Sequence, residues 1–187
     1  MTIIKKITTL ACVSLLSACA SMGAGTVAEK KQSIQTMKNE VLTQLYKKKP
    51  AARSEINNAP GYAVFSNANV NLIFVAAGTG YGLAKNMKTG KETYMNMAEG
   101  GIGFGLGAKD YRIVMVFKTD KALTNFIENG WTVGGNADAA AKASKKGGSI
   151  EGEVQYGDVT VYTYTEAGLA LQATVKGTKF WVDDELN

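Results

Sequence analysis

Histidine is absent from this sequence, and the serines that could act as nucleophiles therefore lack their usual partner. The 187 residues include no histidine, which excludes serine–histidine and cysteine–histidine catalysis and any zinc or haem site that uses imidazole. Ser66 and Ser144 could act as nucleophiles, but neither has an imidazole to serve as its base. We therefore predict that the protein is not an enzyme and that it uses no cofactor.

Two groups of carboxylates have a spacing that could serve a cation. Glu151 and Glu153 lie two residues apart near the start of a predicted strand, where alternate side chains share a face. Asp183, Asp184 and Glu185 form an acidic run close to the end of the sequence. Oxygen ligands of this kind suit a hard cation such as Ca²⁺. A solvated acidic surface is the better explanation of these carboxylates, and we predict no metal site.

The first eighteen residues have the composition of a bacterial secretion signal. Lys5 and Lys6 provide a positive start, and residues 7–18 are apolar or small, a run too short to cross a bilayer as a helix. The run ends in Leu16-Ser17-Ala18-Cys19, which resembles the lipobox of bacterial lipoproteins, whose cysteine is acylated after cleavage. We predict a lipoprotein signal peptide over residues 1–18 and lipid attachment at Cys19. The alternative is an ordinary secretory signal with an incidental cysteine.

An acylated Cys19 would fix the location of the protein. Lipoproteins of this type usually carry three acyl chains, palmitate among them, and each buried methylene contributes about 0.8 kcal/mol. Residue 20 is alanine and not the aspartate associated with inner-membrane retention. In a Gram-negative host we therefore expect a lipid-anchored outer-membrane protein that faces the periplasm. Without residues 1–18 the chain keeps 19 basic and 16 acidic residues, and so mild an excess does not indicate a nucleic-acid partner.

The elements that would position these residues begin with a long helix. Residues 19–26 comprise the acylated cysteine and a short tether, and residues 27–187 are predicted to form a single domain. Thr26 and Glu29 have the spacing of a capping box, and Pro50 prevents the helix from continuing, so we predict a helix over residues 27–49. Its apolar stripe recurs at steps of three and four residues and is expected to pack on a sheet: Ile34, Met37, Val41 and Leu45.

The rest of the chain alternates between strand patterns and one further long helix. A short helix is predicted over residues 52–58, and a second main helix follows the Thr119-Asp120 cap as far as the stop at Gly130. Strands are predicted over residues 62–65, 70–77 and 112–117, in a hairpin around residues 86–90, and within residues 158–182. Residues 139–146 fit a helix or a loop. We predict an α+β fold in which a strongly coiled antiparallel sheet, which could approach a barrel, packs against the helices.

Glycines recur at every second position in two segments. These segments are Gly78-Thr79-Gly80-Tyr81-Gly82 and the run from Gly101 to Gly107. Because side chains alternate along a strand, each segment would have one face of bare backbone. The glycines could serve sheet coiling, barrel closure or close packing. Two alternatives are a groove for an acyl chain or headgroup, and a phosphate cradle of backbone N–H groups, although neither segment matches a nucleotide-binding motif.

Several separated blocks, in order, resemble the SYLF domain family over about residues 27–185. The blocks are Gly61-Tyr62-Ala63-Val64-Phe65-Ser66-Asn67, residues 100–107, residues 111–126, Gly168-Leu169-Ala170-Leu171 and Gly177-Thr178-Lys179-Phe180-Trp181. The last of these is typical of bacterial members. Eukaryotic members bind phosphoinositides, partly through a basic amphipathic helix, and some bind actin. For this chain the resemblance implies binding of anionic phospholipid in general.

The cations that the resemblance assigns to lipid headgroups lie where the first helix ends. They are Lys47, Lys48, Lys49 and Arg53, and each cation near an anionic surface contributes about 1 kcal/mol. They could equally be solvated residues that cap the helix. We predict a membrane-anchored, non-catalytic phospholipid-binding lipoprotein of the cell envelope. The alternative is a structural or protein-interaction module with an envelope protein as its partner, in which only the lipid anchor contacts the membrane.

Overall fold

The computed structural model describes residues 25–72, 75–102, 107–133, 153–165, 168–169 and 175–187. The predicted signal peptide, Cys19 and most of the tether lie outside these residues, as do Ser144, Glu151, residues 139–146 and much of the second glycine segment. The helices are α1 (Val27–Lys48), α2 (Ala51–Asn58) and α3 (Asp120–Asn129). The strands are β1 (Gly61–Leu72), β2 (Val75–Asn86), β3 (Glu92–Ile102), β4 (Gly107–Phe117), β5 (Trp131–Val133), β6 (Glu153–Tyr156), β7 (Val159–Thr165), β8 (Gly168–Leu169) and β9 (Val175–Val182).

All of these strands belong to one antiparallel sheet, which confirms the predicted α+β class. The strand order is β5-β9-β3-β2-β1-β4-β7-β6, and β8 pairs with β7. The sheet is strongly curled. In a flat sheet, β1 and β9 would lie about 14 Å apart, because two strands separate them and each spacing is about 4.8 Å. The rings of Phe65 on β1 and Phe180 on β9 are nevertheless only 4.7 Å apart between centroids, so the sheet forms a half-barrel.

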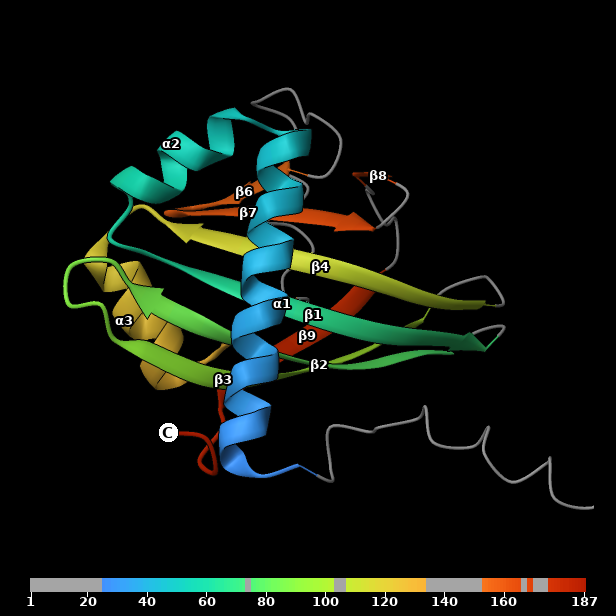
Figure 1. The fold of residues 1–187 in the computed structure, drawn as a ribbon. Coiled ribbons are helices and arrows are strands. Elements are labelled where there is room, and N and C mark those ends of the chain that lie inside the picture. The colour runs from blue at the N-terminus through green and yellow to red at the C-terminus, as the bar shows by residue number, and fades with distance from the viewer. Residues whose placement is uncertain (1–24, 73–74, 103–106, 134–152, 166–167, 170–174) are drawn as a thin grey trace, which may run out of the picture.

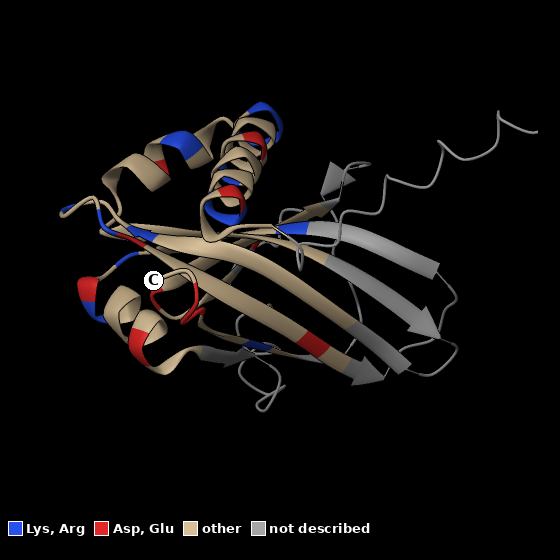
Figure 2. Ribbon diagram, turned by 60° about the horizontal axis from the view of Figure 1, so that its bottom comes forward, with Lys and Arg blue, Asp and Glu red and all other residues tan. Residues whose placement is uncertain are grey.

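Helices cover both faces of this sheet (Figures 1 and 2). α1 and α2 lie on the outer face, and α3 lies on the inner face. β1 therefore has apolar side chains on both sides: Tyr62 and Val64 belong to the core beneath α1, and Phe65 belongs to the core beneath α3. A strand that is buried on both faces reads as a continuous apolar run, not as an alternating one. This explains the unbroken apolar sequence at residues 62–65.

The first helix has the predicted start and the predicted packing face. The Thr26 backbone N–H donates to Glu29 Oε2 at 2.8 Å, and the Glu29 N–H donates to Thr26 Oγ1 at 3.3 Å, which completes the capping box. All four residues of the predicted stripe are buried against the sheet: Ile34, Met37, Val41 and Leu45. The helix ends at Lys48, one residue earlier than predicted, because Lys49 has left the helical conformation.

One strand prediction was wrong. Residues 70–77 do not form a single strand, since Leu72 ends β1 and its register partner Val75 begins β2. The error arose because one apolar run includes both the end of β1 and the start of β2. The polar residues Asn67 and Asn71, which a local pattern would place outside a strand, belong to β1. The hairpin prediction is confirmed: Asn86 Oδ1 accepts from the N–H groups of Lys88 and Thr89, and Gly90 has φ of 73°.

Candidate functional site

The candidate site is the basic surface, defined here as Lys47, Lys48, Lys49 and Arg53. Three of these residues belong to the last turn of α1 and its cap, and Arg53 belongs to the first turn of α2, which starts directly after Pro50. Lys47, Lys48 and Arg53 are exposed, whereas Lys49 is half-buried. The structure therefore brings the four predicted cations together at one end of α1.

Lys49 differs from the other three cations because it is held by an acid. Its Nζ forms an ion pair with a carboxylate oxygen of Glu153 on β6, and it also lies 5.7 Å from the ring centroid of Tyr162. This contact joins residues that are 104 positions apart. Glu153 is thus paired with a lysine, and among the described residues no group of acids is placed to hold a metal ion.

Arg53 is positioned by stacking. Its guanidinium carbon lies 4.3 Å from the ring centroid of Tyr46, in the last turn of α1. A stacked guanidinium keeps its N–H edges available, and those edges match a phosphate or carboxylate in a two-pronged geometry. Lys48 likewise lies over a ring, 5.9 Å from the centroid of Tyr164. Aromatic side chains thus support two exposed cations.

The second acid of this region is also engaged. The hydroxyl of Tyr162 donates to Glu55 Oε2. Burial of the phenol, together with this hydrogen bond and the negative charge of Glu55, raises the pKa of Tyr162 far above its ordinary value, so the hydroxyl stays protonated and continues to donate. Glu55 and Glu153, the acids that the described residues place beside the basic surface, therefore have partners. Because Lys47, Lys48 and Arg53 are exposed, the surface is suited to binding an anion.

A buried polar cluster beneath the middle of α1 was not anticipated from the sequence. Lys38 Nζ lies 3.0 Å from Glu92 Oε1, Lys85 Nζ lies 3.4 Å from the same oxygen, and Gln35 donates to the other oxygen. Burial alone would raise the pKa of Glu92, but the hydrogen bonds from Lys38 and Gln35 and the two lysine charges together lower it. The cluster is fully paired, so we interpret it as a clamp between α1 and the sheet.

We expect Glu92→Gln to cost about 1–3 kcal/mol of unfolding free energy at neutral pH, because it leaves the buried Lys38 without its carboxylate. The lowered pKa means that Glu92 stabilises the fold fully above pH of about 4.5, its ordinary value. That contribution disappears as the pH falls through the lowered pKa. Urea unfolding between pH 7 and pH 3 should therefore show the wild type and the variant converging in acid. Glu40→Gln, at an exposed position of α1, is the control.

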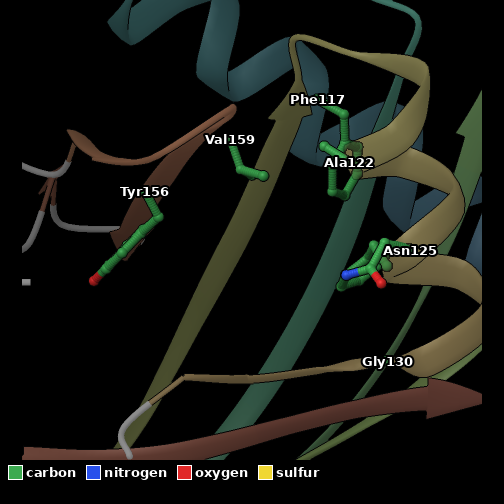
Figure 3. Close-up of a pocket in the computed structure, with 7 residues that line it drawn as sticks. Phe117, Ala122, Asn125, Gly130, Tyr156 and Val159 are labelled. Atoms are coloured by element: carbon green, nitrogen blue, oxygen red, sulfur yellow. The ribbon is translucent and has the colours of Figure 1, made fainter. Parts of the chain in front are cut away.

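A shallow pocket lies on the inner face of the sheet, away from the basic surface (Figure 3). It has a volume of about 150 Å³ and is lined by Phe117, Ala122, Asn125, Phe126, Gly130, Tyr156 and Val159. The lining is aromatic and aliphatic apart from the Asn125 amide and the Tyr156 hydroxyl. It contains no charged side chain, so it offers nothing that would recognise an anionic group.

The other residues with catalytic potential have structural positions. Ser66 is buried within β1. The Asp183 carboxylate accepts from the N–H groups of Glu185 and Leu186 and from the Asn96 side chain. Glu185 pairs with Lys30 on α1 at 2.7 Å. The predicted solvated acidic run thus includes a turn that fastens the C-terminal segment to α1 and β3.

Within the described residues, no helix is both long and apolar enough to cross a bilayer.

Comparison with known proteins gives two findings. Residues 98–187 match the family model Ysc84, described as "Las17-binding protein actin regulator". The chain is also 32% identical over 161 residues to Beta cell expansion factor A of Aeromonas veronii. That match covers 86% of this chain and 60% of the relative, which is less than two thirds of the relative's length.

Proposed function

We propose that this chain, whose residues 98–187 belong to the Ysc84 (SYLF) family, is an anchored, non-catalytic phospholipid-binding lipoprotein of the bacterial envelope. The family binds lipids in general. The observation that carries the proposal for this chain is the composition of the basic surface: Lys47, Lys48 and Arg53 are exposed, and the neighbouring acids Glu55 and Glu153 are already engaged. Glu153 is neutralised by Lys49, and Glu55 keeps its charge, so the four cations of the basic surface outnumber these two acids and attract an anionic headgroup.

The expected affinity of this surface is electrostatic and modest. Each lysine or arginine near an anionic membrane contributes about 1 kcal/mol, and the attraction falls off within a Debye length of about 8 Å at physiological salt. Three exposed cations therefore supply about 3 kcal/mol, a factor of about 150 in the binding constant. The apolar stripe of α1 is buried against the sheet, so it has no part in this binding. Contact with lipid would be limited to headgroups.

The test uses the mature chain from residue 20, which contains every described element but no cysteine. We expect it to bind vesicles that contain phosphatidylglycerol, to bind phosphatidylcholine vesicles poorly, and to dissociate as salt increases. Reversing the charges of Lys47, Lys48 and Arg53 together to Glu should weaken binding about a hundredfold or more. Cosedimentation with vesicles measures this.

The matched control reverses three exposed lysines elsewhere on the molecule: Lys91, Lys121 and Lys179. It makes the same change in net charge away from the basic surface. Equal loss of binding in both triple variants would mean that only net charge matters. Equal binding of the wild type to both lipid compositions would contradict the proposal itself.

The anchor is proposed from the sequence alone. Acylation of Cys19 and a position on the periplasmic side of the outer membrane predict that the intact protein fractionates with outer membranes. They also predict that mass spectrometry finds an acylated N-terminal peptide beginning at residue 19. Cys19→Ser should abolish both results. Recovery of an unmodified protein from the culture fluid would count against the anchor.

The family description supports a second candidate function. It names a protein partner, Las17, and actin regulation, so a protein-interaction role in the envelope is the alternative for this chain. Crosslinking in whole cells separates the two candidates: a single dominant protein adduct formed through the domain would favour a protein partner over phospholipid.

A further inference from the structure

The proposed anchor and the basic surface lie at opposite ends of α1. Cys19 precedes the first residue of the helix, Val27, whereas Lys47 and Lys48 form its last turn. A helix of 22 residues is about 33 Å long, at 1.5 Å per residue. Figure 1 shows that the C-terminal segment lies beside the N-terminal end of α1, and the ion pair between Lys30 and Glu185 fixes it there.

The charges at these two ends have opposite sign. At the N-terminal end of α1, the acids are Glu29 and the run Asp183, Asp184 and Glu185, against Lys30 and Lys31. Lys30 is taken by Glu185, and Lys31 lies over the Tyr94 ring at 5.2 Å. This acidic end would be repelled by an anionic membrane, whereas the basic surface at the other end would be attracted.

The length of the tether limits how the domain can approach its own membrane. Val27 lies eight positions after Cys19, and a fully extended chain covers at most about 3.6 Å per position, or about 29 Å in total. The tether is therefore shorter than α1 even when it is fully extended.

Neither upright arrangement of the helix fits these distances. With the N-terminal end of α1 at the membrane and the helix standing upright, the cations would be about 33 Å away, several Debye lengths from the surface. With the basic surface down and the helix upright, the tether would have to span about 33 Å, which exceeds its reach. Both contacts require α1 to lie well away from upright, and repulsion of its acidic end favours an inclined helix over one that lies flat.

We propose that the anchored protein holds its domain on the membrane at two points, with α1 inclined and its basic end down. This inference rests on the proposed function. It specifies the surface that faces phospholipid, namely the last turn of α1 and the exposed side of α2, and it leaves the acidic end raised. The reach of the tether limits the inclination to about 60° from the membrane plane. Because the domain is tethered, it meets its own membrane at a millimolar effective concentration, so weak headgroup contacts suffice.

The experiment uses the mature acylated protein in phosphatidylglycerol vesicles, with one cysteine introduced at a time and labelled with a fluorophore. Cys19 does not compete, because its thiol carries the lipid. The positions are Ser54→Cys on α2, Asp184→Cys at the acidic end and Thr124→Cys on α3, all exposed. A quencher attached to lipid headgroups reports contact. We expect quenching at position 54 to exceed that at positions 184 and 124 several-fold.

Two outcomes would overturn the proposed orientation. The first is stronger quenching at position 184 than at position 54. The second is clustering of vesicles, because it would show that the basic surface binds a second membrane. In the anchored protein, reversal of Lys47, Lys48 and Arg53 to Glu should abolish the excess quenching at position 54 without releasing the protein. High salt should also abolish the excess quenching at position 54, because it screens the attraction between the cations and the anionic lipid.

The unanchored chain distinguishes failure of this inference from failure of the proposed function. If the chain from residue 20 binds anionic vesicles while position 54 of the anchored protein shows no excess quenching, the orientation is wrong and lipid binding stands. If the unanchored chain does not bind and position 54 of the anchored protein also shows no excess quenching, both proposals fall. Labelled protein in detergent micelles lacking the quencher provides the baseline for each position.

Discussion

Replacing Val41 by Asp is expected to lower the free energy of unfolding by about 4 kcal/mol or more. Val41 is only 2% exposed and lies in the middle of the α1 face that packs on the sheet. Its surroundings are apolar, so an aspartate there would be a buried charge without a partner. The carbonyl oxygen of Val41 also accepts a hydrogen bond from the Tyr164 hydroxyl, so displacement of the helix would break that contact too. Thermal and urea unfolding measure the loss.

Gln44→Asp is the matched control for this substitution. Gln44 lies on the exposed side of the same helix, where an aspartate costs only its lower helix propensity, a few tenths of a kcal/mol. Equal stability of the two variants would show that the stripe faces solvent or membrane instead of the sheet. The comparison therefore also tests whether α1 is free to insert its apolar face into a bilayer.

The packing of α1 restricts how this domain can use a basic helix. An amphipathic helix that binds membranes buries its apolar face among the lipids, but in this protein the sheet already occupies that face. The helix can therefore contribute only what remains exposed at its C-terminal end, Lys47 and Lys48, together with Arg53 from α2. For this reason we expect salt-sensitive, superficial binding and not insertion.

The helices were predictable because their signals are local. The capping box at Thr26, the stop at Pro50 and the cap at Thr119 all act over three or four residues. The order of the strands and the curl of the sheet depend instead on contacts between distant residues, such as the Phe65–Phe180 pair. Where two apolar strand ends follow each other, as in residues 70–77, local patterns cannot show where one strand stops.

The candidate site was predictable to the same limited extent. The four cations of the basic surface are adjacent or nearly so in the sequence, so their grouping could be seen. Their acidic partners could not be predicted, because these contacts join residues far apart in the sequence. Lys49 and Glu153 are 104 positions apart, and Lys38 and Glu92 are 54 positions apart. A lysine that is committed to a distant acid has no local sequence pattern that separates it from a free one.

The substitution Gly82→Ala is expected to destabilise the protein by about 3 kcal/mol or more. A Cβ atom at position 82 would overlap the carbonyl oxygen of Val64 and lie 2.6 Å from Phe65 Cδ1. The first neighbour is backbone in the middle of the sheet, and the second is an aromatic ring packed between Phe126 and Phe180. Neither can move without disturbing the inner core. Gly80 has a similar neighbour, since its Cβ would lie 2.5 Å from the Ser66 carbonyl oxygen.

These contacts favour close packing as the role of the first glycine segment, since backbone and the Phe65 ring fill the space beside Gly80 and Gly82. Gly100→Ala supplies the control, because a Cβ atom there would meet nothing within 4 Å. Alanine at position 100 reduces the conformational entropy of the unfolded chain, so this substitution should leave the free energy of unfolding unchanged or raise it by up to about 1 kcal/mol. Urea unfolding should show a large loss of stability for Gly82→Ala and none for Gly100→Ala. That difference would establish that the contacts at position 82, and not the loss of a strand glycine as such, destabilise the protein. Similar effects at both positions would contradict the packing argument, and the bare backbone at Gly82 would then need another explanation, such as a bound ligand.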